Sequence, residues 1–411
     1  MPATARATPA VPEGVSPRLA ALALTLLLGL QPVTTDIYLP ALPALTRELG
    51  APMAAAQLTL SALILAFGVA QLFWGPVADR VRRRPVLLTG LALYTAASLG
   101  SVLADSIEDL VAWRVVQGAA MAAAVVCARA MVRDLYPPLE GARVMSLGLS
   151  GLGVIAILGP LAGGLATWAA GWRAALAVVT AIGVLTLFFV ATHLPETLTT
   201  PNPRATRLRL LLGTWRHVIR HRVFVAWTAL VSCTYGGLFT MLAGSSFVYI
   251  GLLGLSPGAY GLCMAAGSSS YLAGTFVCRR WLRRHGMVGA VSRGAGFTLA
   301  AGVMMLVLGW LGVHHAGAIL LPQCLYAFGH GIHQPCGQAG AVGPFPHAAG
   351  TAAALAGFAL AATAFVVGLW LGRVLEGGLL PYALTLAFWS AMTAGVAWTL
   401  VQRLGEASRP A

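Results

Sequence analysis

Long apolar segments recur along the whole chain, and they constrain its fold more than any other feature of the sequence. About 20 mainly apolar residues are needed for a helix to cross the hydrocarbon core of a bilayer. Strands are excluded in these segments, because an open strand edge in lipid would leave backbone donors and acceptors without partners. The sequence therefore predicts an all-α integral membrane protein with twelve transmembrane helices. The expected spans are 18–41, 54–76, 85–104, 109–133, 143–168, 172–194, 222–243, 257–278, 289–312, 316–340, 347–371 and 378–402.

The composition indicates that the surface of the protein contacts lipid and not nucleic acid. Of the 411 residues, 58% are hydrophobic and only 9% are charged, yet the formal net charge is +14. The basic residues are all arginine, and they fall between the apolar segments with no interleaved aromatic residues. Loop topology explains such arginines better than phosphate binding does. We therefore expect the lipid bilayer as a partner and no nucleic acid.

The longest polar stretch divides the chain into two halves. Residues 195–221 follow the sixth expected span and form a cytoplasmic linker between two six-helix bundles at 18–194 and 222–403. Residues 1–17 are expected to form a disordered cytoplasmic tail, and 404–411 a second cytoplasmic tail. Two halves whose helices are interrupted by glycine and proline are typical of transporters that rock around a central cavity.

The distribution of arginine predicts the orientation in the membrane. If the N-terminus is inside, nearly all arginines fall in inward-facing segments, which the positive-inside rule requires. We therefore expect a multi-pass protein of the bacterial inner membrane with both termini in the cytoplasm. The inward clusters lie at 80–84, 204–222 and 279–293, against Arg47, Arg173 and Arg373 outside.

A carboxyl group and an arginine within the spans are candidates for proton coupling. Charges in a membrane helix are expensive and therefore functional by default. At 1.5 Å per residue, Asp36 and Arg114 reach a similar depth in the outer part of the membrane, and Gln117 shares a face with Arg114. Apolar surroundings favour a protonated carboxyl and a nearby arginine favours the charged form, so a moving partner can switch its state. We predict Asp36 as the proton-linked group, with Arg114 and Gln117 as modulators. A static Asp36–Arg114 pair, or Asp36 as a helix cap, is the structural alternative.

The segment after the second span has the features of a latch between conformations. It begins at Gly75, and its Asp79 could contact a helix N-terminus while Arg80 and Arg83 hold the inner face. Taken alone, such a charge run is also a common stop-transfer signal. Arg129 lies about four turns beyond Arg114 and is expected to be an inner-gate or interface residue, not a cargo ligand.

The fifth span combines a proline with glycines that permit movement. Pro160 removes a backbone hydrogen bond and kinks the helix, and Gly159, Gly163 and Gly164 allow close contact with a neighbouring helix. We expect these residues to take part in conformational change.

The tenth span carries two histidines one turn apart. His330 and His333, with Gln334 beside them, would need further ligands to hold a metal, and no third ligand is near in the sequence. We expect no metal and no cofactor, and we assign these residues to cavity polarity or a proton-sensitive contact. Aromatic side chains are expected to line the same apolar substrate cavity. They are Tyr38, Tyr235, Phe239 and Tyr326.

Several of these segments together resemble the major facilitator superfamily, and within it the drug:proton antiporters of the bicyclomycin-resistance (Bcr/CflA) type. Two departures stand out. The family's loop motif, at 75–85, normally has glycine where this chain has Arg82. The family's antiporter motif, in the fifth span, often has glycine where this chain has Ile155. The resemblance implies the major facilitator fold, a monomer, and proton-coupled efflux of small amphipathic or drug-like compounds, as in multidrug and antibiotic resistance. The segments that carry it are 35–43, 75–85, 114–118, 129–136, 159–164, 244–249 and 345–352.

Two alternatives remain open on the sequence. A dedicated exporter or importer of one metabolite, such as an amino acid or a siderophore, could use the same fold, because substrate preference resides in sites. A membrane enzyme or metal sensor could use His330 and His333, but the sequence has no constellation of acids, histidines or nucleophile with base. We therefore expect a carrier of a small-molecule substrate and protons, and not an enzyme.

Overall fold

The computed structural model describes residues 16–375 and 378–405. Most of the two expected cytoplasmic tails, 1–17 and 404–411, therefore lies outside the described residues. Within the described part, every regular element is a helix, as the apolar segments predict. The elements are α1 (Pro17–Asp36), η1 (Leu39–Ala41), α2 (Leu42–Glu48), α3 (Met53–Val81), α4 (Arg83–Val102), α5 (Ile107–Leu135), α6 (Pro138–His193), α7 (Leu208–Arg220), α8 (Arg222–Ser246), η2 (Phe247–Leu252), α9 (Pro257–Trp310), α10 (Ala316–Val342), η3 (Pro346–Ala348), α11 (Ala349–Val374), α12 (Leu379–Trp398) and α13 (Leu400–Leu404).

Serine caps begin three of the long helices. The hydroxyl of Ser16 accepts a hydrogen bond from Leu19 N at 3.2 Å, and Ser106 and Ser256 do the same for α5 and α9 at 3.1 and 3.2 Å. Each bond satisfies one of the backbone N–H groups that a helix leaves free at its start. Local sequence thus places these helix starts, while the apolar faces drive the packing.

The long helices correspond to the twelve expected spans once two kinks are taken into account. Among the described residues, nine helices are long and apolar enough to cross a membrane. Two of them are broken by non-helical residues, α6 at Ala170 and Gly171 and α9 at Gly286. Each break lies between two predicted spans, so each helix is two crossings joined by a sharp turn. The less apolar α10, with 27 residues, is long enough at about 1.5 Å per residue to be the twelfth.

The segment 195–221, expected to be a linker, contains a helix. Apolar residues recur along α7 at helical spacing, and one of them, Val218, is fully buried while Leu208, Leu212 and Ile219 are exposed. The ring of Trp215 contacts Phe73 of α3 edge-on, with ring centroids 6.2 Å apart. α7 is therefore an amphipathic helix docked against one end of the bundle, with part of its apolar surface free.

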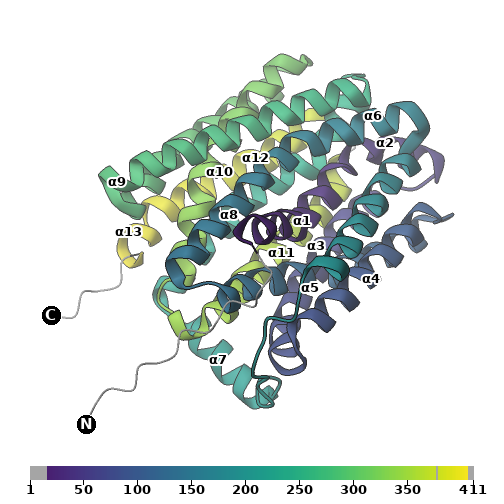
Figure 1. The fold of residues 1–411 in the computed structure, drawn as a ribbon. Coiled ribbons are helices and arrows are strands. Elements are labelled where there is room, and N and C mark those ends of the chain that lie inside the picture. Colours follow the sequence, from purple (N-terminus) through teal and green to yellow (C-terminus); the bar gives the residue numbers. More distant parts are fainter. Residues whose placement is uncertain (1–15, 376–377, 406–411) are drawn as a thin grey trace, which may run out of the picture.

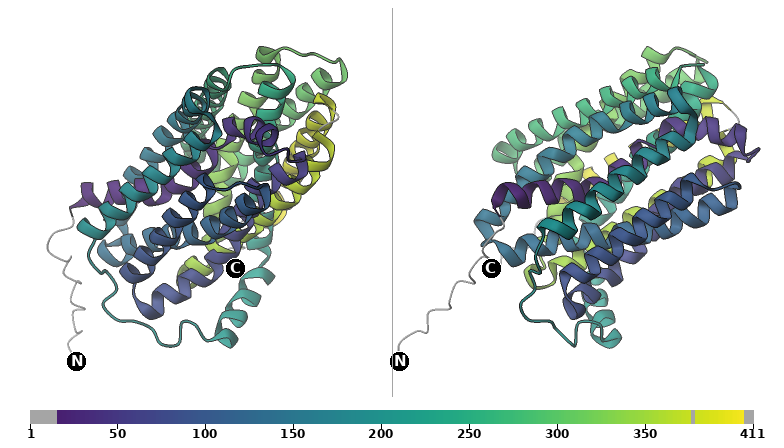
Figure 2. Two further views of the ribbon diagram at one scale, coloured as in Figure 1. Left: turned by 90° about the vertical axis from the view of Figure 1, so that its right-hand side faces the viewer. Right: turned by 45° about the vertical axis from the view of Figure 1, so that its right-hand side comes forward.

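The helices form one bundle of two packed halves (Figures 1 and 2). In the first half α3 packs against α5 and α1 against α6, and in the second α9 packs against α10 and α12. The halves meet along α3 with α11 and along α6 with α9. We call the end with residues 80–84 and α7 the arginine-rich end, and the end with α2 the far end. Both described chain ends lie toward the arginine-rich end in Figure 1.

Candidate transport site

Asp36 is the last residue of α1 and lies partly buried between the two halves. Its carboxylate accepts a hydrogen bond from the Thr35 hydroxyl at 2.8 Å. It faces α6, because a Cβ atom added at Gly159 would lie 3.4 Å from the Asp36 Cβ. Tyr235 of α8 and Tyr260 of α9 lie close enough to interact electrostatically with it. A change in the charge of Asp36 therefore changes its electrostatic interaction with helices of both halves.

Arg114 is fully buried in α5 and is held by neutral groups. Its guanidinium donates to Gln117 Oε1 at 2.8 Å and to the Thr34 carbonyl at 3.3 Å, and it lies 4.0 Å from the centroid of the Tyr38 ring. Gln117 in turn donates to the Ser98 hydroxyl at 2.6 Å. Arg114 and Gln117 therefore share a face as predicted. Arg114 Nε has no hydrogen-bond partner, so the charge is incompletely compensated.

Asp36, at the end of α1, and Arg114, of α5, lie on different sides of α1. Arg114 reaches Thr34 from α5, whereas Asp36 faces α6. None of the ion pairs in the described part of the chain includes either residue. The static Asp36–Arg114 pair that we weighed as the structural alternative is thus not formed in this conformation.

Four charged side chains form a network at the arginine-rich end. Arg83 is buried and pairs with Asp79 at 2.5 Å and with Asp134 of α5 at 3.0 Å. The carboxylate of Glu196 accepts hydrogen bonds from the backbone N–H groups of Arg83 and Arg84, both at 3.1 Å. Among the residues the structure describes, Glu196 is thus the carboxylate at the N-terminus of α4. The position that we expected for Asp79 against a helix N-terminus is not observed, since its carboxylate is bound to Arg83.

The latch motif at 75–85 is hydrogen-bonded to the segment that precedes α7. Arg80 donates to the Thr206 hydroxyl at 2.7 Å, and Asn202 N donates to the Asp79 carbonyl at 2.8 Å. Gly75, by contrast, has no tight contact, because a Cβ atom there would meet only Val126 at 3.7 Å. The latch motif therefore ties α3, α4 and the connection between the halves together.

Arg82 adopts a backbone conformation that normally requires glycine. It separates α3 from α4 with a φ of +129° and a ψ of +158°. This region is sterically unfavourable for residues with a Cβ atom. Arginine at this position, where the motif normally has glycine, is therefore a strained residue in the loop.

The glycines of α6 permit a close backbone contact with α1 and α9. A Cβ atom at Gly163 would overlap the carbonyl group of Ile37, and one at Gly164 would overlap that of Pro257. Gly261 of α9 faces the carbonyl of Pro160 in the same way. These contacts, together with a 2.8 Å hydrogen bond from Gln57 of α3 to a carbonyl of α8, hold the halves together toward the far end.

The second departure from the motif, Ile155, is accommodated by another glycine. Its terminal methyl group occupies the place that a side chain on Gly29 of α1 would need. The extra volume in α6 is therefore balanced by a missing side chain in α1, and the two helices remain in contact.

A cavity of about 120 Å³ lies between the halves, nearer the arginine-rich end. It contains two of the predicted cavity residues, Tyr235 and Gln334, and also Arg129, which we expected at an inner gate. Its walls come from α1, α3, α5, α8, α10 and α11, so both halves contribute. The lining residues are Gln31, Ile64, Phe67, Gln71, Arg129, Val231, Tyr235, Gln334, Gln338, Val342, Ala353, Ala356, Gly357, Leu360 and Ala361.

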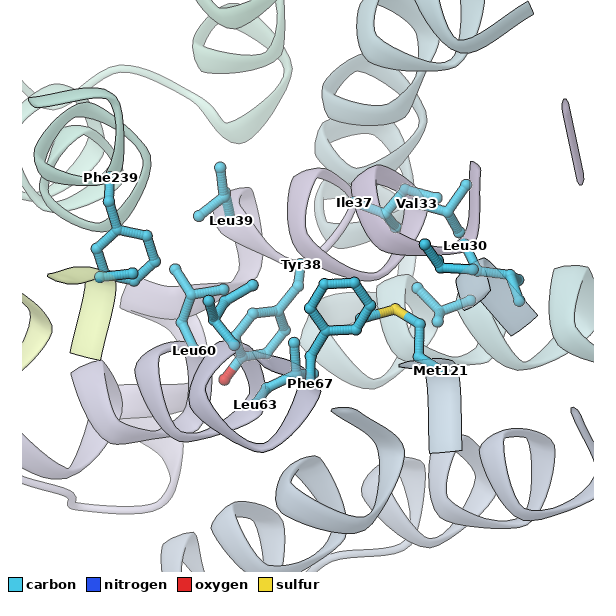
Figure 3. Packing of buried hydrophobic residues seen from close by; sticks show 14 of the residues in the cluster. Leu30, Val33, Ile37, Tyr38, Leu39, Leu60, Leu63, Phe67, Met121 and Phe239 are labelled. Atoms are coloured by element: carbon cyan, nitrogen blue, oxygen red, sulfur yellow. The ribbon is translucent and has the colours of Figure 1, made fainter. Parts of the chain in front are cut away.

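The other predicted cavity residues are packed away from this cavity. Tyr38 is buried and shares a 2.6 Å hydrogen bond with the Thr59 hydroxyl. Phe239 of α8 lies in the packed interior beside Leu39 and Leu60, as Figure 3 shows. Tyr326 is also buried, and its hydroxyl donates to the Thr234 carbonyl at 2.9 Å. In this conformation these rings stabilise the bundle and do not face the cavity.

The two histidines of α10 also lie inside the second half. His330 and His333 share hydrogen bonds of 3.1 and 3.4 Å with the Thr234 hydroxyl, and His333 is 3.2 Å from the carbonyl of Val291. They are buried between α8, α9 and α10. Within the described chain no group of three metal-ligating side chains is found. The assignment of this pair to the substrate cavity does not fit this conformation, because neither ring reaches it.

The comparison with known families decides what the bundle is. The family model of the Major Facilitator Superfamily matches residues 24–368, which is most of the chain. The chain belongs to the Major Facilitator Superfamily. Its architecture of twelve crossings in two halves is the fold of that family.

Relatives and solved structures agree with this membership. The chain is 32% identical to multidrug resistance protein D of Escherichia coli K12 over 82% of this chain and 84% of that protein. It is 27% identical to a bicyclomycin resistance protein homolog of Haemophilus influenzae, over 64% and 67% of the two chains. The fold matches a partially occluded, inward-open structure of the xylose transporter XylE from E. coli with a TM-score of 0.75, 14% identity and coverage of 96% and 99%.

Two parts of this transporter's site were missed by sequence reasoning. Glu196 acts on α4 from a distance of more than 100 residues along the chain, so no local pattern marks it. Gln71 and Gln31 are polar residues within apolar spans, and that feature is a usable signal, because polar groups in membrane helices usually face a cavity or a partner.

Proposed function

We propose that this transporter exports small amphipathic or drug-like organic compounds in exchange for protons. Membership in the superfamily makes the chain a multi-pass membrane carrier of small molecules and not an enzyme. The relatives that carry multidrug and bicyclomycin resistance in their names support a role in drug efflux. The observation that carries the proton-coupling part of the proposal is the position of Asp36 at the junction of the halves.

Asp36 couples proton binding to movement in this proposal. A carboxylate in a partly buried position costs free energy unless it is protonated or paired. Its neighbours here are a threonine hydroxyl and two tyrosines, and it forms no ion pair with any cation in the described part of the chain. Protonation removes that cost and allows the close α1–α6 contact, whereas proton release favours a state in which water or Arg114 reaches the carboxylate.

We assign the glycine contacts and the latch motif to opposite ends of the bundle, where each stabilises one part of the transport cycle. The tight α6–α9 contact at Gly164 and Gly261 closes the far end in this conformation, and the cavity lies on the other side of it. The network of Arg83 with Asp79 and Asp134 braces the arginine-rich end of the first half. We propose that the α6–α9 contact opens when the cavity turns to face the far end.

We place the arginine-rich end in the cytoplasm of a bacterial cell. The positive-inside rule favours this orientation, and with it the cavity near that end receives cargo from the inside. The protein would then reside in the inner membrane as a monomer, with 195–221 as the cytoplasmic connection between its two bundles.

The test is cargo-induced proton movement in proteoliposomes. A cationic, a neutral and a zwitterionic compound, namely ethidium, chloramphenicol and norfloxacin, are added to the wild type and to Asp36→Asn. We expect proton movement with more than one compound for the wild type and none for the variant. Asp109→Asn, which changes an exposed carboxylate in the first turn of α5, is the matched control and should behave as the wild type. Response to a single compound would favour a dedicated metabolite carrier.

A further inference from the structure

The charge in the wall of the central cavity, as far as the described residues form it, is positive. Of the described residues that line the cavity, Arg129 is the only charged one. It projects from α5, about four turns nearer the arginine-rich end than Arg114, and its side chain is exposed. An amphipathic cargo that enters this space therefore meets a guanidinium group and no carboxylate.

Arg129 also has no hydrogen-bond or ion-pair partner among the residues that the structure describes. The structure gives Arg83 two carboxylates, and it gives Arg114 a glutamine, a carbonyl and an aromatic ring. No hydrogen bond or ion pair within the described chain involves the Arg129 side chain, and the charge that acts on it electrostatically is the like charge of Arg133. A guanidinium carries five N–H donors in a fixed fork, so Arg129 offers an unused binding surface to the cavity.

Two amide side chains in the same cavity have unused hydrogen-bonding groups. Gln71 of α3 is 4% exposed, and its Nε2 has no hydrogen-bond partner. Gln334 of α10 has an unpartnered Oε1. Buried polar groups without partners are costly, and both of these line the cavity. The cost is removed if a bound molecule supplies the missing partners.

We propose that Arg129 and Gln71 bind an anionic group of the cargo, of which a carboxylate is the simplest. The inference rests on the proposed export function and names the class of compound that this site prefers. Arginine binds carboxylates through two parallel hydrogen bonds, and the Gln71 amide adds a donor from α3, which packs against α5. Gln334 accepts a hydrogen bond from a hydroxyl or amine of the cargo.

The apolar lining accepts the remainder of such a molecule. Ile64 and Phe67 of α3 and Leu360 and Ala361 of α11 line the cavity, so each half supplies hydrocarbon surface to it. An aromatic carboxylate or a zwitterion with an aromatic body satisfies both features. The preference for anionic over cationic cargo follows from the charge, because a cation would meet Arg129 with no compensating acid.

The test is binding to the purified full chain in detergent without a proton gradient. The probes are 1-naphthoate, its uncharged analogue 1-naphthamide, and 1-naphthylmethylammonium, measured by equilibrium dialysis. We expect the wild type to bind naphthoate about tenfold more tightly than naphthamide, since a hydrogen bond to a charged group contributes roughly 1.5–3 kcal/mol. Naphthylmethylammonium should bind most weakly.

Arg129→Gln should abolish the preference for naphthoate, and Arg129→Lys should retain part of it. Arg133→Gln is the matched control, because this arginine is exposed one turn further along α5 and does not line the cavity. Gln71→Leu should weaken naphthoate binding about threefold, and it carries the test if Arg129→Gln does not purify as a monodisperse protein. Equal affinities for the three probes in the wild type, or loss of the preference in Arg133→Gln as well, would overturn the proposal.

The result separates this proposal from the proposed function. If the naphthoate preference depends on Arg129 but cargo moves no protons in liposomes, the export mechanism fails and the anion site stands. If cargo-driven proton movement occurs while the three probes bind alike, the anion site fails and the coupling mechanism stands.

Discussion

The strained backbone of Arg82 predicts that glycine at this position stabilises the protein. A residue with a Cβ atom in this region of φ and ψ costs roughly 1–3 kcal/mol. Glycine removes that cost, but it raises the conformational entropy of the unfolded chain, which offsets roughly 0.4–1 kcal/mol of the gain. The Arg82 side chain is exposed, and within the described structure it makes no hydrogen bond or ion pair, so its removal costs little. Arg82→Gly should therefore raise the free energy of unfolding by about 0.5–2 kcal/mol.

The assay is thermal unfolding of the purified protein in detergent, with Arg82→Ala as the control. Alanine removes the same side chain but keeps the Cβ atom, so it should leave the unfolding midpoint close to that of the wild type. A higher midpoint for Arg82→Gly alone confirms the strain. Equal gains in both variants would instead assign the effect to the loss of a positive charge from the arginine cluster, and a lower midpoint for Arg82→Gly would refute the reasoning.

Two further predictions concern Arg114 and Glu196. Arg114→Ala removes the cation that donates to the Thr34 carbonyl, two residues before Asp36. The pH profile of transport should therefore move to higher pH or transport should stop, while Arg114→Lys should move it less. An unchanged profile would reduce Arg114 to a structural role. Glu196→Gln loses two charge-assisted hydrogen bonds at the N-terminus of α4 and should lower the free energy of unfolding by roughly 1 kcal/mol. Thermal unfolding in detergent measures this, and an unchanged midpoint would contradict the capping role.

Much of the fold could be predicted because the membrane imposes strict rules on sequence. Apolar segments of about 20 residues predict the crossings, and the breaks at Gly171 and Gly286 fall where two such segments meet. The helix α7 could not be recognised by the same rule. Its apolar residues lie on one face of a surface helix. Because they occur within a polar, proline-containing stretch, the sequence pattern there predicts a linker.

The site was predicted less completely than the fold. The sequence identifies Asp36 and Arg114 as unusual charges, but it does not say that Asp36 faces α6 while Arg114 reaches Thr34 of α1 from α5. Helical periodicity does not settle this, since α1 ends at Asp36. The histidine pair was placed in the cavity because polar groups in membrane helices usually line one, yet His330 is satisfied by a threonine within its own half. Arg129 was expected to be an inner-gate or interface residue because of its position about four turns beyond Arg114, and its place in the cavity wall becomes visible only in three dimensions.

The most direct test of proton coupling compares two modes of transport in Asp36→Asn. In proteoliposomes, norfloxacin exchange at equal pH on both sides requires only cargo binding and rocking, whereas accumulation driven by a pH gradient also requires proton release. We expect the variant to keep exchange and to lose gradient-driven accumulation, since asparagine cannot change its charge. Accumulation at the wild-type level in Asp36→Asn would contradict the assignment of Asp36 as the coupling residue.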